Sequence, residues 1–175
     1  RLGASVEAFD TRQAAKEEVH SLGAKFVEVE GATDDRGAGG YAVAQSEEFL
    51  ARQRAEVQAR ASKSDLIICT AQVRGRKAPV LITADTVAQM RPGSVIVDLA
   101  ASTGGNCECT ENNKTVVING VTIIGDSNLA ARIPQDASVL FGNNVANFMK
   151  LLIAKDGSLQ MDFNNEIVKG SCINQ

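Results

Sequence analysis

Two short, uninterrupted apolar runs constrain the fold of this chain more than any other feature. Residues 66–70 (Leu-Ile-Ile-Cys-Thr) and 94–99 (Ser-Val-Ile-Val-Asp-Leu) are each bounded by turn-forming residues. Runs of this length are typical of strands buried on both faces of a parallel sheet. Helical patterns alternate with strand patterns along the chain. This alternation predicts an α/β fold, a sheet of parallel strands with helical crossovers, centred on these two runs.

Three further segments carry strand patterns. Residues 5–10 contain the apolar side chains of Val6, Ala8 and Phe9 and end in an aspartate, whereas residues 25–30 alternate polar and apolar side chains, as a more exposed strand does. Residues 121–125 follow another apolar run, 116–120, which ends in Asn-Gly. Because Asn-Gly strongly favours a two-residue turn, we expect a β-hairpin over these two runs.

Four segments carry helical patterns. Gly23 is a typical stop for the first, Thr83 is a good N-terminal cap for the third, and the fourth is a long helix with apolar side chains along one side. The tail after this helix shows only a weak strand-like alternation at 166–170, with no evident partner strand. The predicted helices are 11–22, 47–61, 83–90 and 136–154.

The composition excludes several functions. The chain has 175 residues, a net charge of -3 and 4% aromatic residues, so it offers neither the basic stripe nor the stacking rings of a nucleic-acid surface. No apolar run approaches the roughly 18 residues that span a bilayer. Four cysteines and a single histidine do not make a convincing zinc set, so we expect no metal and four reduced thiols.

Asp10 is the first candidate binding residue. It ends the apolar run 5–10, which is entered through Leu-Gly-Ala at residues 2–4. A carboxylate that ends the second strand of a dinucleotide-binding βαβ unit accepts hydrogen bonds from the adenosine ribose, and it favours NAD because the 2′-phosphate of NADP would repel it. The Gly-rich loop expected about 20 residues earlier is absent, so either the chain is a fragment or the ribose assignment is wrong. A role as N-cap of the next helix is compatible with ribose binding.

Small and polar residues follow the other predicted strands. The carboxyl ends of parallel strands meet at one edge of a sheet, and ligands of doubly wound folds bind there. Residues 70–71 and 100–101 are small enough to let a flat ring and a sugar approach the backbone, although tight turns also prefer such residues. The segments expected at this edge are 10–12, 70–72, 99–106 and 126–129.

A long connection, residues 31–45, contains Gly39, Gly40 and Tyr41, the only tyrosine of the chain. We predict a mobile loop whose Tyr41 ring closes over a bound cofactor, although a Gly-rich stretch alone is more often a simple solvent loop. His20 falls late in the first predicted helix, and we expect it to be solvated rather than catalytic.

Six motifs follow one another along the chain. They are Arg-Leu-Gly-Ala at 1–4, Phe-Asp-Thr-Arg at 9–12, Ala-Gly-Gly-Tyr-Ala at 38–42, Gly-Arg-Lys-Ala-Pro at 75–79, the segment 91–100, and Gly-Gly-Asn at 104–106. Together they resemble the NAD(H)-binding domain I of proton-translocating nicotinamide nucleotide transhydrogenase, within the alanine dehydrogenase/transhydrogenase superfamily. The resemblance is specific because the motifs occur in the right order at the right separations, and it extends from residue 1 to about residue 153, and more faintly through 167–170.

The resemblance implies a reaction and a set of partners. NADH on this domain passes a hydride to NADP on a separate domain, and the transfer is coupled to proton movement through a membrane domain. The domain would be a soluble part of an inner-membrane or plasma-membrane enzyme, on the matrix or cytoplasmic side, and would form a homodimer. A direct hydride transfer needs positioning and exclusion of water but no general acid or base, so no catalytic side chain is expected.

The resemblance also implies a Rossmann-like, doubly wound and mostly parallel sheet, and it gives the boundaries of the expected domain. Residues 1–154 would be a partial NAD(H)-binding Rossmann domain with a trailing helix, and 155–175 its C-terminal tail. The first strand, the Gly-rich loop and the preceding N-terminal lobe of domain I are missing, so the chain alone should be inactive. By position, the cofactor-binding residues are Asp10, Thr11, Arg12, Gly40, Tyr41, Gln53, Thr70, Ala71 and Gln72.

Two alternatives remain open. Alanine dehydrogenase shares the fold, but it has an acidic residue where this chain has Ser102 and lacks the Gly39-Gly40-Tyr41 insertion. Both departures favour transhydrogenase, although transhydrogenases often carry a glutamate at the position of Ser102. The other alternative is a non-catalytic Rossmann-like module that has lost its cofactor.

Overall fold

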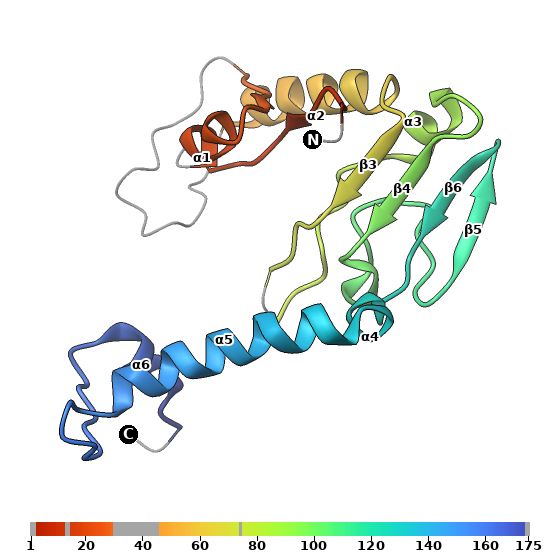
Figure 1. Cartoon of the computed structure of the whole chain (residues 1–175). Coiled ribbons are helices and arrows are strands. Elements are labelled where there is room, and N and C mark those ends of the chain that lie inside the picture. Colours follow the sequence, from red (N-terminus) through yellow and green to blue (C-terminus); the bar gives the residue numbers. More distant parts are fainter. Residues whose placement is uncertain (1–2, 13–14, 30–45, 74, 174–175) are drawn as a thin grey trace. The chain divides into compact units, whose positions relative to one another are not determined.

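The computed structural model describes residues 3–12, 15–29, 46–73 and 75–173. The chain divides into two compact units, Arg1–Ser127 and Asn128–Gln175. The α/β fold expected from the sequence is confirmed, with helices alternating with a mostly parallel set of strands (Figure 1).

A four-stranded sheet in the order β3-β4-β6-β5 forms the body of the larger unit (Figure 1). The first three strands of this order are parallel, and β5 runs antiparallel to β6. Asn119 and Gly120 join β5 to β6 with φ angles of 53° and 79°, which suit a type I′ turn and confirm the predicted hairpin. The strands are β3 (Leu66–Cys69), β4 (Val95–Asp98), β5 (Thr115–Ile118) and β6 (Val121–Ile124).

A separate two-stranded parallel sheet precedes it in sequence. It consists of β1 (Glu7–Ala8) and β2 (Lys25–Phe26), joined through α1 (Ala15–Ser21). Both strands are shorter than the predicted runs 5–10 and 25–30. Within the described residues, β1 and β2 pair only with each other, so neither strand has hydrogen-bonding partners on both sides.

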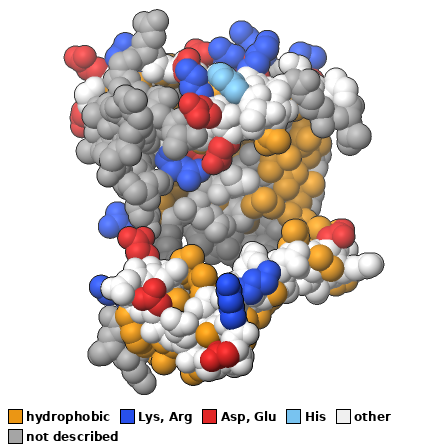
Figure 2. All heavy atoms as spheres, turned by 60° about the vertical axis from the view of Figure 1, so that its left-hand side comes forward, with side chains coloured by type: hydrophobic (Ala, Val, Ile, Leu, Met, Phe, Trp, Pro, Cys, Tyr) orange, Lys and Arg blue, Asp and Glu red, His pale blue; other side chains and the backbone are white. Residues whose placement is uncertain are grey.

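The prediction that β3 and β4 form the centre of the sheet is right for β4 and wrong for β3. Ile96 of β4 is fully buried, but Leu66 and Ile68 of β3 are 56% and 60% exposed. Among the described strands β3 pairs only with β4, so its other edge carries no partner. Figure 2 shows hydrophobic side chains gathered on the surface of this unit.

The two helices that flank β3 in sequence begin where the sequence predicts. Helix α2 (Glu47–Ala61) follows Ser46, whose hydroxyl accepts the N–H of Phe49 at 3.2 Å. Helix α3 (Ala84–Gln89) follows Thr83, whose hydroxyl accepts the N–H of Thr86 at 3.2 Å. Each cap satisfies one of the N–H groups that the first turn of a helix leaves without a partner.

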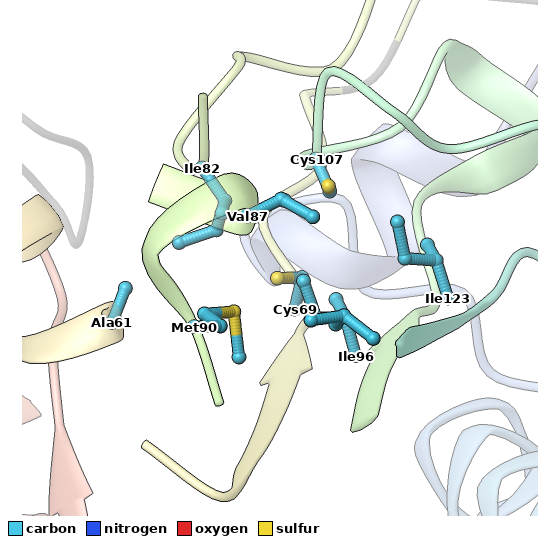
Figure 3. Packing of buried hydrophobic residues seen from close by; sticks show 9 residues of the cluster. Ala61, Cys69, Ile82, Val87, Met90, Ile96, Cys107 and Ile123 are labelled. Atoms are coloured by element: carbon cyan, nitrogen blue, oxygen red, sulfur yellow. The ribbon is translucent and has the colours of Figure 1, made fainter. Parts of the chain in front are cut away.

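The core of the larger unit joins these helices to the four-stranded sheet (Figure 3). Val87 of α3 packs with Ile96 of β4 and Ile123 of β6, and all three are fully buried. Cys69 and Cys107 belong to the same cluster, so the prediction that Cys69 behaves as a small buried hydrophobe is confirmed.

The smaller unit is helical. It contains α4 (Leu129–Arg132), α5 (Pro134–Leu152) and α6 (Glu166–Ser171). Helix α5 agrees with the predicted long helix to within two residues, but no residue of it is buried. None of the described helices is both long and apolar enough to cross a membrane.

The strand-like alternation at 166–170 is misleading, because this segment is α6. The side chain of Asn165 accepts the N–H groups of Ile167 and Val168 at 3.0 and 3.3 Å and so starts the helix. Val168 is the buried residue of α6. A capping side chain and one buried contact therefore outweigh a weak pattern of period two.

Candidate functional site

A trough of about 810 Å³ in the larger unit brings together two of the segments predicted to bind the cofactor. Asp10, Thr11 and Arg12, which follow β1, line one side, and Thr70, Ala71 and Gln72, which follow β3, line another. Six of the nine predicted cofactor-binding residues therefore share one trough.

The other three predicted residues do not lie in it. Gln53 is on α2, half-buried, and is not among the residues that line the trough. Gly40 and Tyr41 lie outside the described residues. His20 is exposed near the end of α1, as predicted.

Arg12 donates three hydrogen bonds to the carboxylate of Asp10, which lies two residues earlier in the chain. The backbone N–H of Arg12 donates to Oδ1 at 2.8 Å, Nε donates to Oδ1 at 3.0 Å, and Nη2 donates to Oδ2 at 2.8 Å. The carboxylate thus caps its own turn, while α1 begins only at Ala15. Carboxylate oxygens accept more than one hydrogen bond, so these contacts leave room for a hydroxyl ligand.

The Asp10 carboxyl is held in its charged form. Partial burial by itself would raise its pKa, but the hydrogen bonds from the side chain and backbone of Arg12, with the guanidinium charge, outweigh burial and hold the pKa below its ordinary value of 3.8. A charged carboxylate just after a strand is a strong acceptor for hydroxyl groups, as in the dinucleotide sites of doubly wound folds.

The side chain of Asn106 holds the turn after β3 in place through hydrogen bonds to its backbone. Its Oδ1 accepts the N–H of Ala71 at 3.0 Å, and its Nδ2 donates to the carbonyls of Ala71 at 2.9 Å and Pro79 at 2.8 Å. Gln72 adds a second link, because its Nε2 donates to the carbonyl of Leu99 at 2.9 Å. The ends of β3 and β4 are therefore tied together at the carboxyl edge of the sheet.

Asp98, at the end of β4, organises the turn that carries Asn106. Its fully buried carboxylate accepts the N–H of Ala100 at 3.0 Å, of Asn106 at 2.7 Å and of Cys107 at 2.9 Å, and the hydroxyl of Thr110 at 2.6 Å. Four donors around one carboxylate compensate for the loss of its hydration.

Gly105 is required by the same arrangement. Its φ is +80°, and a Cβ at this position would lie 2.9 Å from Oδ2 of Asp98. Neither Asp98 nor Asn106 was predicted as a positioning residue. The available signal was an aspartate ending an apolar run, followed by Gly-Gly-Asn at 104–106.

The whole chain, residues 1–175, matches the family model described as alanine dehydrogenase/PNT, C-terminal domain. The chain belongs to this family. It is 46% identical over 176 residues to an NAD(P) transhydrogenase alpha-subunit protein of Rhodospirillum rubrum, with 99% of the chain and 46% of that protein covered. It is 45% identical over 171 residues to NAD(P) transhydrogenase subunit alpha of Haemophilus influenzae, with 97% and 33% covered.

This member of the alanine dehydrogenase/PNT family is less similar to the alanine dehydrogenases than to these transhydrogenase subunits. The Bacillus subtilis alanine dehydrogenase is 34% identical over 104 residues, which cover 57% of the chain. Among solved structures, the transhydrogenase from Sinorhizobium meliloti superposes with a TM-score of 0.74 at 41% identity, covering 97% of this chain and 43% of that one. For an L-alanine dehydrogenase the TM-score is 0.61 at 28% identity, covering 86% and 37%.

The relatives are longer than this chain, which spans less than half the length of the two transhydrogenase subunits. The resemblance inferred from the sequence motifs is confirmed, as is the Rossmann-like fold class. The chain is related to NAD(P) transhydrogenase alpha subunits, which places it in an oxidoreductase family.

Two of the four thiols of this family member, Cys69 and Cys107, are buried and difficult to ionise. Burial raises the pKa of Cys69 to about 12 and that of Cys107 to about 11, so both stay protonated at neutral pH. None of the four cysteines forms a disulfide. Within the portion of the chain that the structure describes, no cluster of three or more His, Cys, Asp or Glu side chains could hold a metal ion.

Proposed function

We propose that the trough between β1 and β3 belongs to the NAD(H) site of a proton-translocating transhydrogenase. The observation that carries the proposal is that Asp10–Arg12 and Thr70–Gln72, which are 58 or more residues apart in sequence, line one trough. A carboxylate that follows one strand and small residues that follow another are components of dinucleotide sites. Similarity to transhydrogenase alpha subunits along nearly the whole chain supports this interpretation.

The residues of the site would bind and orient the cofactor. The charged Asp10 would accept the ribose hydroxyls of NADH, and the small side chains of Thr70 and Ala71 would let the nucleotide approach the backbone. NADH, when bound, supplies the hydride, so the site needs no general acid, general base or metal. Gly40 and Tyr41 would close over the cofactor, and Gln53 would add a contact.

We also propose that a further strand fills the part of the trough that lies along β1 and β3, next to the turns that would bind the cofactor. Backbone groups of successive residues in a parallel strand point alternately to its two neighbours. The carbonyls of Asp65 and Cys69 accept hydrogen bonds from β4, so those of Leu66 and Ile68 point away from it. The carbonyls of Val6 and Ala8 accept from β2 in the same way.

Two strand edges whose backbone groups have no strand partner among the described residues therefore line the trough. The residues whose groups point away from β2 and β4, Glu7 and Phe9 on one side and Leu66 and Ile68 on the other, all line it. A parallel strand placed there gives the order β2-β1-X-β3-β4-β6, the arrangement of doubly wound dinucleotide-binding folds. We assign X, and the Gly-rich loop that would follow it, to the same polypeptide outside these 175 residues.

The remaining partners follow from the same proposal. NADP would be held on a separate domain, a membrane domain would couple hydride transfer to proton movement, and the N-terminal lobe of domain I would cover the nicotinamide end. The domain would work as a homodimer on the cytoplasmic or matrix side of its membrane. The 175-residue chain alone would be inactive.

The test is a titration of NADH into the complete subunit, followed by cofactor fluorescence, with NADPH as the control. Saturable binding of NADH with much weaker binding of NADPH supports the proposal. No binding at millimolar NADH would refute the proposal, and the remaining alternative would be a non-catalytic Rossmann-like module. Reduction of NAD in the presence of L-alanine would instead identify an alanine dehydrogenase, the second family member with a similar fold.

A further inference from the structure

Asn106 is buried next to the trough, and its side-chain amide, backbone N–H and backbone carbonyl all form hydrogen bonds. It is fully buried, and it is not among the residues that line the trough. Besides its side-chain bonds to Ala71 and Pro79, its carbonyl accepts the N–H groups of Leu81 at 2.7 Å and Ile82 at 3.0 Å. Its own N–H donates to Asp98 at 2.7 Å.

The four backbone partners of Asn106 share one property. All of them line the trough, and they belong to two segments, the turn after β3 and the strand-like stretch before α3. One side chain and one peptide group therefore set the relative position of two wall segments. The residues are Ala71, Pro79, Leu81 and Ile82.

We propose that Asn106 is a positioning residue for nucleotide binding, acting through the backbone of Ala71. Both the N–H and the carbonyl of Ala71 are taken by the Asn106 amide, which fixes the orientation of the turn that should face the nucleotide. Asp98 in turn fixes Asn106 through its backbone N–H. The inference rests on the proposed function, because it assigns a role within the same NAD(H) site.

The chain offers a matched control in Gln58. Its side-chain amide also bonds to backbone groups far away in the sequence. Nε2 donates to the carbonyl of Leu81 at 2.7 Å, and Oε1 accepts the N–H of Thr83 at 3.2 Å. The same Oε1 accepts the hydroxyl of Thr86 at 2.6 Å. Gln58 supports α3 but has no hydrogen bond to the turn after β3, so loss of its amide tests stability without loosening Ala71.

The test compares Asn106→Asp with Gln58→Glu in the complete subunit. Each change keeps the shape of the side chain and replaces its NH₂ donor by a second oxygen, which repels the carbonyl it faces when ionised. We expect both variants to melt at a lower temperature at pH 8. For NADH, Asn106→Asp should raise Kd at least tenfold, whereas Gln58→Glu should leave Kd within twofold of wild type.

A pH profile and hydrogen exchange separate positioning from general destabilisation. Protonation of a carboxyl restores one donor, so the ratio of the Asn106→Asp Kd to the wild-type Kd should fall as the pH is lowered from 8.5 to 6. Asn106→Asp keeps an acceptor for the Ala71 N–H but repels the carbonyls of Ala71 and Pro79, so the turn after β3 should open more often. The Ala71 amide should therefore exchange faster than in wild type or Gln58→Glu. If Asn106→Asp does not fold, Asn106→Ser replaces it in the binding and exchange measurements.

The outcomes are distinct. A wild-type subunit that binds no NADH overturns the proposed function and this inference with it. Wild-type binding with an unchanged Kd in the folded Asn106 variant overturns the positioning role alone. An equal rise of Kd in the Asn106 and Gln58 variants also overturns it, because the loss would then follow from destabilisation of the unit as a whole.

Discussion

Arg12 donates three hydrogen bonds to the carboxylate of Asp10, one from its backbone N–H and two from guanidinium nitrogens, at 2.8 to 3.0 Å. The pair is partly exposed, with side-chain exposures of 48% for Arg12 and 30% for Asp10. An ion pair in such a position adds little to stability, because water screens it. We therefore expect the pair to matter for ligand binding, because it presents an ordered, negatively charged acceptor just after β1.

Replacing Asp10 by Asn should weaken NADH binding and leave stability nearly unchanged. The amide oxygen can still accept the backbone N–H of Arg12, but the charge that strengthens hydrogen bonds to ribose is lost, which costs roughly tenfold in affinity. NADH titration and thermal melting of the complete subunit measure the two effects. An unaltered Kd would rule out the ribose assignment.

The contribution of Asp10 to stability should depend on pH only in acid. Its pKa is lower in the folded chain than the ordinary 3.8, so the stabilisation is fully present above pH 3.8 and is lost as the pH falls through the lower, folded value. The difference in melting temperature between wild type and Asp10→Asn should thus be constant from pH 8 down to about 5. A difference that changes within this range would contradict the assignment.

The outer edge of β3 should need its backbone N–H groups in the complete subunit. Ile68→Pro removes an N–H that points into the trough and leaves the bonds of β3 to β4 intact. If a further strand binds there, the free energy of unfolding should fall by about 2 kcal/mol or more, because a buried carbonyl of that strand loses its donor.

Val117→Pro is the matched control for this change. Val117 lies on the edge strand β5, opposite Thr122. In an antiparallel pair, hydrogen-bonded and non-hydrogen-bonded positions alternate, and the pair next to the turn, Ile118 and Val121, is hydrogen-bonded. The N–H of Val117 therefore points away from β6. Chemical denaturation of both variants gives the comparison. Equal losses of stability would show that no strand pairs with β3.

The four thiols should differ in reactivity. Cys69 and Cys107 are buried and their pKa values are raised to about 12 and about 11, so iodoacetamide at pH 8 should leave both unmodified in the folded chain. Cys109 and Cys172 are only half-buried and should be modified first. Mass spectrometry of peptides before and after unfolding measures the order, and early labelling of Cys69 would contradict the packing of the core.

Local sequence patterns predicted most of the elements correctly. The predicted helix 47–61 has the same bounds as α2, and Asn119-Gly120 forms the expected turn. These features depend on capping, periodicity and turn chemistry, which act over a few residues. Where the local signal was weak, as at 166–170, the prediction was wrong because a capping asparagine and one buried contact decided the structure.

The burial of β3 and the lengths of β1 and β2 could not be predicted in this way. An apolar run such as 66–70 reports that a strand is suited to burial on both sides, but not which strands of a given chain are present to bury it. Within the described residues its outer edge is open, and it lines the trough instead.

By itself, the sequence determined the α/β order of the elements, the hairpin, and the acidic and small residues that end the strands, because short-range periodicity and turn chemistry specify such features. Only the tertiary structure decided that the turns after β1 and β3 line one trough, and that Asn106 reaches Ala71 across 35 positions. Contacts of that range depend on strand register and on the burial of polar groups, which only the folded chain establishes.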